Sequence, residues 1–403
     1  MIRIAILADF PVHRLRSYEE CAPGHHATWL PPLAKELEAH ASEFDFHWII
    51  CTKEVAKPTK IHTWGQTFHL LPRRKLSLEI LTAFLRERRQ ISNLLSSLKP
   101  DLVHAWGTEQ GYALAANDSP FPSLISMQGL LQTYCAAARM PILTRVQALN
   151  ERRVLRHASH LTVESPWGRD QLSTLAPHAN IDLLEYGVDP ACFDIQRNLP
   201  PIPPSSLPSP NTQSSISSPS PSPFQRFSDS ASQHLPLALF VGSISLLKGI
   251  DTLIAAFSDL RLRDIELVII GAGNLLIIKH PLPSNVRVLG HLPQADVRDW
   301  MSKAWCLVHP TRADTSPNCV KEARVIGLPV ITTPNGGQTQ YVEHGKSGFI
   351  HASGDVEGLI QGVLSVIASR ETSLQMGATG QANCRAALTP SATAGHLLNI
   401  YQR

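Results

Sequence analysis

Short apolar runs alternate with longer amphipathic stretches along most of the chain. We expect strands at the apolar runs, and helices where apolar positions recur every three or four residues. In the first half the expected strands are 2–7, 46–51, 68–71, 102–105, 123–126, 161–164 and 181–184, and the expected helices are 28–40, 76–98 and 141–156. A second series has expected strands at 237–242, 266–270, 286–289, 306–309, 329–332 and 348–350, and a last helix at 391–401. This alternation predicts an α/β fold of two parallel sheets, each with helices on both faces.

The composition changes between Gln196 and about residue 235. Proline and serine dominate there, as in Pro200-Pro-Ile-Pro-Pro-Ser-Ser-Leu-Pro-Ser-Pro210. Such a segment buries too little apolar surface to offset the entropy lost on ordering. We therefore interpret residues 196–235 as a disordered insertion at a domain junction. A proline-rich ligand for a partner protein is the alternative, and a solvated linker is favoured.

Length and composition limit the remaining classes. The chain has 403 residues, 43% of them hydrophobic, and a formal charge of +3, which fits two soluble domains and gives no argument for nucleic acid. Seven scattered cysteines form no C-x-x-C pair, so neither disulfides nor a metal site are predicted. The N-terminal apolar run is too short for a signal peptide, and no run approaches the length of a membrane span. We expect a soluble, cytoplasmic protein.

The most distinctive stretch is Asp314-Thr-Ser-Pro-Asn-Cys-Val-Lys-Glu322, which leads to Gly327-Leu-Pro329 and a short apolar strand. Pro317 suits the first position of a helix, and Ser316 is then placed to cap it. Helical positions eight apart point only about 80° from each other, so the two carboxylates share one side. We expect Asp314 and the helix N-terminus to contact one part of a ligand and Glu322 another. The Gly and Pro residues alone would be equally typical of a structural turn.

This stretch resembles the donor-sugar site of retaining glycosyltransferases of family 4, which have the GT-B fold of two Rossmann-like domains facing a cleft. The family pattern is Glu, seven residues, Glu, with Pro-Asn inside it, then a Gly-x-Pro-Val strand entry and a Gly-Gly turn. The matching residues are Pro317, Asn318, Glu322, Ala323, Gly327, Pro329, Val330, Gly336 and Gly337. Asp314 stands where the family usually has Glu, and Thr315 where it often has Gly. The resemblance implies that Glu322 binds the ribose of a nucleotide, and that Asp314 and the following Thr315, Ser316, Pro317 and Asn318 bind the donor sugar.

A lysine just before a predicted helix is the second candidate feature. Lys248 can meet a diphosphate as a point charge, assisted by helix N-terminal amides, and a surface lysine is the alternative. It matches the lysine of the family's Gly-Arg-(4)-Lys-Gly motif, whose basic residues bind the donor phosphates, while Ser243 replaces the arginine. Phosphate binding would then depend on Lys248, on backbone amides or on a basic group from elsewhere. Gly273, in Gly271-Ala-Gly273, matches a Gly-x-Gly turn near the nucleotide base.

Three positions in the first half carry the resemblance further. Gly24 lies where the family has a Gly-rich loop near the donor phosphate, and the adjacent His25 and His26 are more typical of a solvated cap than of a metal site. His104 and Gln128 follow consecutive predicted strands where the family has histidines, which implies catalytic contacts with the donor sugar. Gln128 can hydrogen-bond a sugar hydroxyl but cannot carry a proton away. A core histidine is the alternative for His104.

The resemblance covers nearly the whole chain except the insertion. It implies an N-terminal acceptor-binding domain at 1–195, a nucleotide-sugar-binding domain at 236–385 and a closing helix at 386–403 that packs back on the first domain. It further implies transfer of a sugar, with retention, from a nucleotide-diphosphate sugar to an acceptor hydroxyl in bacterial cell-surface polysaccharide or glycolipid synthesis. Neither metal nor cofactor is implied, because lysine and backbone dipoles would neutralise the leaving diphosphate.

Two other functions would use the same kind of two-domain α/β fold. A non-catalytic GT-B protein that binds a nucleotide sugar or a partner remains the alternative. A dinucleotide-dependent oxidoreductase is disfavoured because no G-x-G-x-x-G follows the first strand.

Basic residues gather in the first half, on stretches with apolar helix positions. They are Arg73, Arg74, Lys75, Arg86, Arg88, Arg89, Arg152, Arg153 and Arg156. A basic amphipathic helix can rest on anionic lipid, which predicts peripheral contact with the inner face of a membrane and a sugar or lipid-linked acceptor. A solvated helix face is the alternative.

Overall fold

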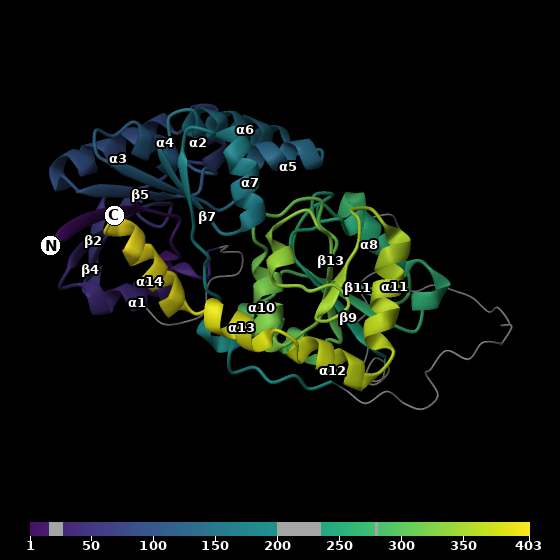
Figure 1. Ribbon diagram of the computed structural model, residues 1–403. Helices are drawn as coiled ribbons and strands as arrows, with labels where there is room; N and C mark the ends of the chain where they lie inside the picture. Colours follow the sequence, from purple (N-terminus) through teal and green to yellow (C-terminus); the bar gives the residue numbers. More distant parts are fainter. Residues whose placement is uncertain (16–26, 200–234, 279–280) are drawn as a thin grey trace, which may run out of the picture.

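The computed structural model describes residues 1–15, 27–199, 235–278 and 281–403, arranged around two separate sheets (Figure 1). The first sheet has the order β3-β4-β2-β1-β5-β6-β7-β8, and its strands are parallel except for the antiparallel pair β3 and β4. Its strands are β1 (Ile2–Leu7), β2 (Phe44–Thr52), β3 (Thr59–Thr63), β4 (Gln66–Pro72), β5 (Leu102–Trp106), β6 (Ser123–Met127), β7 (His160–Val163) and β8 (Asn180–Leu183). The second sheet is parallel throughout, in the order β11-β10-β9-β12-β13-β14. The predicted α/β class with two parallel sheets is therefore confirmed.

Helices cover both faces of each sheet (Figure 1). Those of the first domain are α1 (Leu30–Leu37), α2 (Leu76–Leu81), α3 (Leu85–Leu98), α4 (Tyr112–Asn117), α5 (Leu131–Ala137), α6 (Ile142–Leu155) and α7 (Pro166–Leu175). The second sheet consists of β9 (Leu237–Val241), β10 (Glu266–Ile270), β11 (Val286–Gly290), β12 (Cys306–His309), β13 (Val330–Thr332) and β14 (Gly348–Ile350). Its helices are α8 (Ile250–Phe257), α9 (Gln294–Lys303), α10 (Asn318–Ile326), α11 (Val356–Ile367), α12 (Arg370–Ala378) and α13 (Gln381–Ala387), and the chain ends in α14 (Pro390–Tyr401).

One expected helix differs from the structure, and one strand was not expected. The single helix predicted at 76–98 is divided into α2 and α3, because Ala83 and Phe84 adopt positive φ angles of 49° and 55° that no α-helix contains. Phe84 is fully buried, which gives a packing reason for the break. The strand β3 was not predicted; it pairs along the edge of the sheet, and its residues are only partly buried, so its apolar pattern is weak.

The chain crosses between the domains twice. After α13 it returns to the first domain, where α14 packs beside α1 and the N-terminus (Figure 1). The Tyr401 hydroxyl lies 2.6 Å from Nδ1 of His104 on β5. On the other crossing, Arg197 donates to the carbonyls of Gly327, Ser373 and Ala304, and Leu199 is buried. Residues 196–199 thus pack on the second domain rather than belonging to a disordered insertion, and residues 200–234 lie outside the described part of the chain.

Candidate active site

Two cavities meet at the N-terminus of α10. The large cavity, about 790 Å³, lies mainly against the second domain, where it is lined by Lys248, Asp314 and Glu322. The small cavity, about 340 Å³, lies mainly against the first domain. Ser316 and Asn318 line both cavities, so the two spaces adjoin where α10 begins. The structure thus brings the three charged residues predicted for the donor site to one place.

A cluster of Lys248, Asp314 and His309 forms one wall of the large cavity. The Lys248 ammonium forms an ion pair with Oδ2 of Asp314, and Nε2 of His309 lies 3.2 Å from the same oxygen. Burial would raise the pKa of Asp314, but Lys248 and His309 hold it well below its usual range, so this carboxylate is ionised. The sequence predicted both charged residues as ligand contacts but did not predict that they contact each other.

Two glycine-containing turns hold Lys248 and Asp314 close to each other. Gly249 has a φ of 70°, and a Cβ atom there would lie 1.9 Å from the carbonyl oxygen of Pro310. Only glycine lets this loop approach β12 so closely, and that approach carries Lys248 to Asp314. The predicted turn at Asn335–Gly337 holds the other partner: the N–H of Gly337 donates to the carbonyl of Asp314 at 3.0 Å, and the N–H of Asp314 donates to Asn335 at 3.2 Å.

The start of α10 differs from the prediction in one detail. The helix begins at Asn318 with Pro317 as its N-cap, and no side chain caps it. Ser316 is therefore not a cap; its hydroxyl lies 3.5 Å from that of Tyr341 and it lines both cavities. The N-terminal end of α10, with its partial positive charge, is directed at the junction of the cavities. Glu322, one turn further, lines the large cavity and is only 6% exposed.

Thr315 does not lie where a donor-binding residue should. It is fully buried and lines neither cavity. Its N–H donates to the Tyr134 hydroxyl at 3.0 Å, its own hydroxyl lies 2.8 Å from the same group, and its carbonyl accepts from the Ser165 hydroxyl at 2.6 Å. Because all its polar groups are bonded to the first domain, Thr315 joins the domains, and its predicted donor contact is not supported.

Of the donor contacts predicted at Ser243, Gly273 and Gly24, the structure places Ser243 at the large cavity. Ser243 lines the large cavity, as do Gly271 and Ala272 at the end of β10. Gly273 does not; a Cβ atom there would lie 2.3 Å from the carbonyl oxygen of Ile244, so its role is to let two loops pack together. Gly24, with His25 and His26, lies outside the described residues.

In the first domain, Gln128 lines the small cavity and His104 does not. His104 is fully buried on β5, between the hydroxyls of Tyr401 and of Ser126, which lies 2.7 Å from Nε2. Burial lowers the pKa of His104 to about 3, so the ring is neutral. The catalytic contact predicted for His104 is therefore wrong in this structure, and the alternative of a core histidine fits its surroundings.

Several residues at the site were not found from the sequence. His291 lines the large cavity, and no sequence motif marked it. His309 also lines it; the sequence placed His309 at the end of the strand before the carboxylate loop, where the family has Pro-Ser, but assigned it no role. Lys321 is fully buried beside Glu322; its ammonium lies 2.6 Å from a carboxylate oxygen of Glu164 and donates to the carbonyl of Tyr186. This ion pair crosses the domain boundary at the base of the site. Two sequence signals were available for Glu164: its place at the end of a predicted strand, and the match of Val163-Glu-Ser165 to a Ser-Glu-like strand end of the family.

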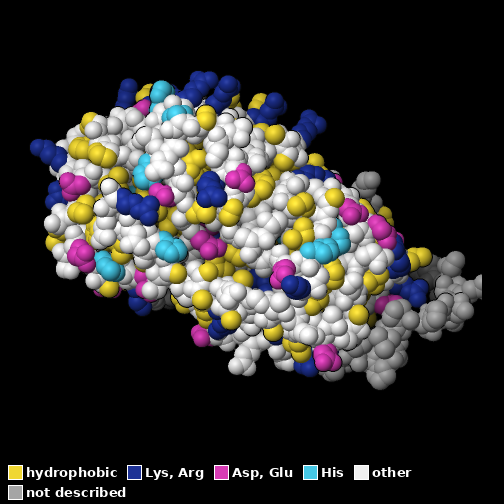
Figure 2. All heavy atoms as spheres, in the orientation of Figure 1, with side chains coloured by type: hydrophobic (Ala, Val, Ile, Leu, Met, Phe, Trp, Pro, Cys, Tyr) yellow, Lys and Arg dark blue, Asp and Glu magenta, His cyan; other side chains and the backbone are white. Residues whose placement is uncertain are grey.

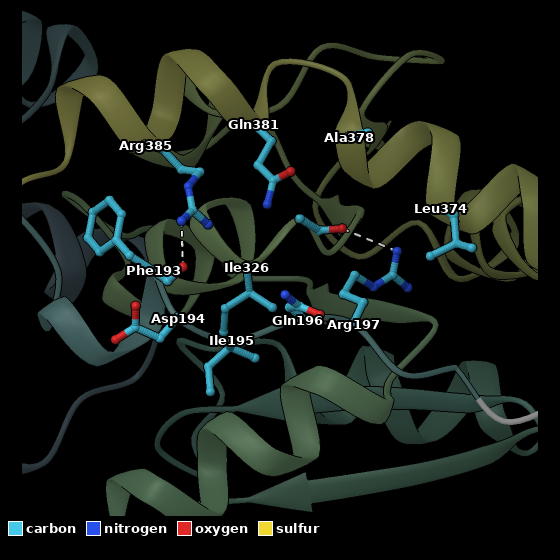
Figure 3. Close-up of a pocket in the computed structure, with 11 residues that line it drawn as sticks. Phe193, Asp194, Ile195, Gln196, Arg197, Ile326, Leu374, Ala378, Gln381 and Arg385 are labelled. Carbon is cyan, nitrogen blue, oxygen red and sulfur yellow. Dashed lines mark hydrogen bonds between the residues drawn. The ribbon is translucent and has the colours of Figure 1, made fainter.

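A third cavity, about 560 Å³, lies behind α10, where residues 193–197 pass α12 and α13 (Figure 3). Its two arginines are directed at backbone rather than at the open space: Arg385 donates to the carbonyl of Phe193, and Arg197 to that of Gly327 (Figure 3). Both arginines of this cavity are thus occupied by backbone carbonyls of the segment that crosses between the domains and of the loop after α10.

Within residues 1–15, 27–199, 235–278 and 281–403, no three His, Cys, Asp or Glu side chains are gathered as metal ligands. In the same described residues, no helix combines the length and apolar character needed to cross a bilayer.

Two family matches cover most of the chain. Glycosyl transferases group 1 matches residues 222–383, and the glycosyl transferase 4-like domain matches residues 24–187. Among curated relatives, a D-inositol 3-phosphate glycosyltransferase of Jonesia denitrificans is 31% identical over 183 residues, which are 41% of this chain and 42% of that protein. An uncharacterized glycosyltransferase of Methanocaldococcus jannaschii is 30% identical over 149 residues, or 36% and 41% of the two chains. The chain thus spans less than half the length of these relatives.

Solved structures match along the whole chain. A sucrose-phosphate synthase from Thermosynechococcus elongatus has a TM-score of 0.73 at 17% identity, with 100% of this chain and 98% of that one covered. Anabaena HepE in complex with UDP has a TM-score of 0.63 at 14% identity, with both chains fully covered. At these identities the likeness shows the fold, which is that of glycosyltransferases with two facing α/β domains. With both family matches and this fold, the chain belongs to the group 1, family 4-like glycosyltransferases of the GT-B fold.

Proposed function

We propose that the protein moves a sugar, with retention, from a nucleotide-diphosphate sugar in the large cavity to a hydroxyl of an acceptor in the small cavity. One observation carries the proposal: Lys248, Asp314 and Glu322 line a single cavity that adjoins a second one at the N-terminus of α10. A diphosphate needs a cation and helix amides, and a ribose diol needs a carboxylate, and the large cavity has all three.

Each group has a distinct role in this proposal. Lys248 exchanges the Asp314 carboxylate for diphosphate oxygens, and Asp314 then accepts hydrogen bonds from donor-sugar hydroxyls. His309 keeps Asp314 oriented through the contact at 3.2 Å. Glu322 accepts from the two ribose hydroxyls. The leaving phosphate oxygen takes the acceptor proton, so the protein mainly orients the reactants and stabilises charge.

The names of similar proteins support the proposed donor and setting. HepE was solved with UDP and with UDP-glucose, which supports a nucleotide-sugar donor. A relative from Erwinia amylovora is an amylovoran biosynthesis glycosyltransferase, and the solved WaaG takes part in lipopolysaccharide biosynthesis. We extend that setting, synthesis of a cell-surface polysaccharide or glycolipid, to this chain.

A screen of nucleotide sugars tests the proposal. The true donor should raise the unfolding temperature, because a ligand at 100 times its Kd stabilises the folded state by about 2.7 kcal/mol. With that donor, the anomeric proton of the product reports retention by its NMR coupling constant. Absence of stabilisation by any nucleotide diphosphate or nucleotide sugar would refute the donor assignment.

Replacing Lys248 by alanine is expected to weaken donor binding by about 10- to 100-fold, because a charge-assisted contact to phosphate is lost, worth about 1.5–3 kcal/mol. Calorimetric titration with the donor measures this. Lys303→Ala is the matched control, since that lysine is exposed on α9 and pairs only with Asp299. Equal donor affinity in the two variants would remove Lys248 from the site.

The first domain also has a surface suited to anionic lipid. Exposed leucines on and beside α2, at positions 78, 81 and 85, lie among exposed basic residues. Arg74, Arg86 and Arg89 surround a shallow hollow that Leu78 and Leu85 also line. Figure 2 shows dark-blue Lys and Arg side chains along the edge of this domain, with hydrophobic atoms between them.

Not all of the predicted basic residues belong to this surface. Arg73 is largely buried in an ion pair with Glu87 at 2.6 Å, and Arg88 pairs with Asp118. The remaining arginines, together with exposed Ile142 and Leu149 on the neighbouring α6, form the face that we propose to contact a membrane.

Replacement of Arg74, Arg86 and Arg89 by Glu is expected to lower binding to mixed vesicles of phosphatidylglycerol and phosphatidylcholine by at least about 100-fold at low salt. The reason is that each basic residue near an anionic surface contributes roughly 1 kcal/mol to the binding free energy. Sedimentation with the vesicles measures this. Reversal of Lys303 and Lys346, both exposed on the second domain, is the control. Equal binding to pure phosphatidylcholine by the unaltered protein would contradict a charge-dependent contact.

A further inference from the structure

The walls of the small cavity are acidic. Three carboxylate side chains line it, and none of its described lining residues is Lys, Arg or His; the carboxylates are Asp9, Glu109 and Glu164. The large cavity next to it has the carboxylates of Asp314 and Glu322 in its walls, but also the ammonium of Lys248. The small cavity lacks such a cation among its described walls, so it opposes an anion.

The three carboxylates differ in how far neighbours compensate them. Glu164 is paired with Lys321 at 2.6 Å. Asp9 accepts from the Gln110 amide at 2.6 Å and lies 3.7 Å from an Arg73 nitrogen. Glu109 has no ion pair within the described residues.

The surroundings of Glu109 consist of amides rather than cations. Burial raises the pKa of Glu109 to about 7, and the backbone N–H groups of Glu109 itself, Thr108 and Gly129 oppose that rise. Glu109 is therefore the carboxylate of the small cavity that no cation neutralises within the described residues.

The remaining walls are aromatic. The ring centroids of Trp29 and Trp106 are 4.6 Å apart, and Trp29 stacks on Tyr186 at 4.2 Å. Trp106 is 2% exposed, and its indole N–H, which has no hydrogen-bond partner among the described residues, has almost no accessible surface, so we assign it no ligand contact. Flat aromatic walls with a few polar groups suit the C–H face of a sugar-like ring.

From these walls we infer that the small cavity binds a polyol ring, such as a sugar or an amino sugar, whose hydroxyl or amino groups donate hydrogen bonds to Glu109. The same cavity discriminates against a phosphorylated ring. This inference rests on the proposed function, because it gives the chemical class of the acceptor for the same reaction. A phosphate in this cavity would face carboxylates without a cation in the described walls to balance it.

Pairs of small probes that differ only by a phosphate test the inference. Glucosamine and glucosamine 6-phosphate, and glucose and glucose 6-phosphate, are titrated in the presence of saturating UDP. Saturation-transfer NMR and tryptophan fluorescence report binding independently of transfer. We expect each phosphorylated probe to bind at least about 10-fold more weakly than its partner, which corresponds to about 1.4 kcal/mol.

Variants identify the group responsible. Glu109→Gln keeps the shape of the side chain and removes its charge, so the preference within each pair should fall to about threefold or less. Glu36→Gln, on the exposed side of α1, is the control and should leave the preference unchanged. A preference that survives unchanged in Glu109→Gln would overturn the assignment to Glu109, and circular dichroism verifies that the variant is folded.

The two proposals fail in different ways. If UDP neither stabilises nor binds the protein, the donor assignment fails, whatever the sugar probes do. If UDP binds and a phosphorylated probe binds as tightly as its partner, only the inference about the acceptor is overturned. Absence of binding by every probe of both pairs, with UDP bound, would overturn it as well.

Discussion

Replacement of Glu322 by alanine is expected to lower kcat/KM by at least about 100-fold and leave the fold intact. Glu322 lies on the cavity side of α10 and is 6% exposed, so its carboxylate can reach a ligand without solvent competition. Two hydrogen bonds from a ribose diol to a charged group are worth about 1.5–3 kcal/mol each, and 2.7 kcal/mol already corresponds to 100-fold. The loss should lie mainly in donor affinity.

The Glu322→Gln variant separates charge from shape. Burial raises the pKa of Glu322 to about 7; Asp189 adds to this, and Arg298 and Lys321 oppose it. Because a raised pKa leaves the carboxyl protonated at lower pH, donor affinity of the unaltered protein should fall as pH decreases from about 8 to 6. Glu322→Gln should bind donor weakly and without that dependence. A near-normal kcat/KM in Glu322→Ala, with circular dichroism unchanged, would refute the site assignment.

Local sequence signals predicted the framework of the site. Gly327 ends α10 with a φ of 90°, as its place before Leu328-Pro329 indicated. Gly336 and Gly337 form the turn that holds Asp314. Gly327 has a backbone conformation that few residues adopt, and a Cβ atom at Gly336 or Gly337 would lie 2.2 Å from the carbonyl oxygen of Asp314 or Thr315. Each position therefore requires glycine, and such a requirement can be inferred from a single chain.

Contacts between distant segments could not be inferred in the same way. The Thr315 to Tyr134 contact joins residues 181 positions apart, and nothing local marks Thr315 as buried rather than ligand-facing. His104 was placed correctly on a strand, but it lies in the middle of β5 rather than at its end, and its closest partner is Tyr401 on the last helix. In both cases the surroundings decide the role, and they come from tertiary packing.

Replacement of Lys321 by methionine is expected to destabilise the protein by about 3–5 kcal/mol, the largest effect on stability that the site predicts. Lys321 is fully buried, and its ammonium balances Glu164 and donates to the carbonyl of Tyr186. Methionine fills a similar volume but leaves the Glu164 carboxylate in the interface without a cation. Urea unfolding, followed by circular dichroism, measures the loss.

Two variants show whether the loss comes from the unpaired charge. The double variant Lys321→Met/Glu164→Gln removes both charges and should recover most of the stability, because breaking a buried pair costs more than replacing it. Lys303→Met removes an exposed lysine whose ion pair is solvated, and it should change stability by less than about 1 kcal/mol. Since this pair joins the first domain to α10 at the residue next to Glu322, its loss should also weaken donor binding in the folded protein. A double variant as unstable as Lys321→Met would show that Lys321 acts through packing rather than through its charge.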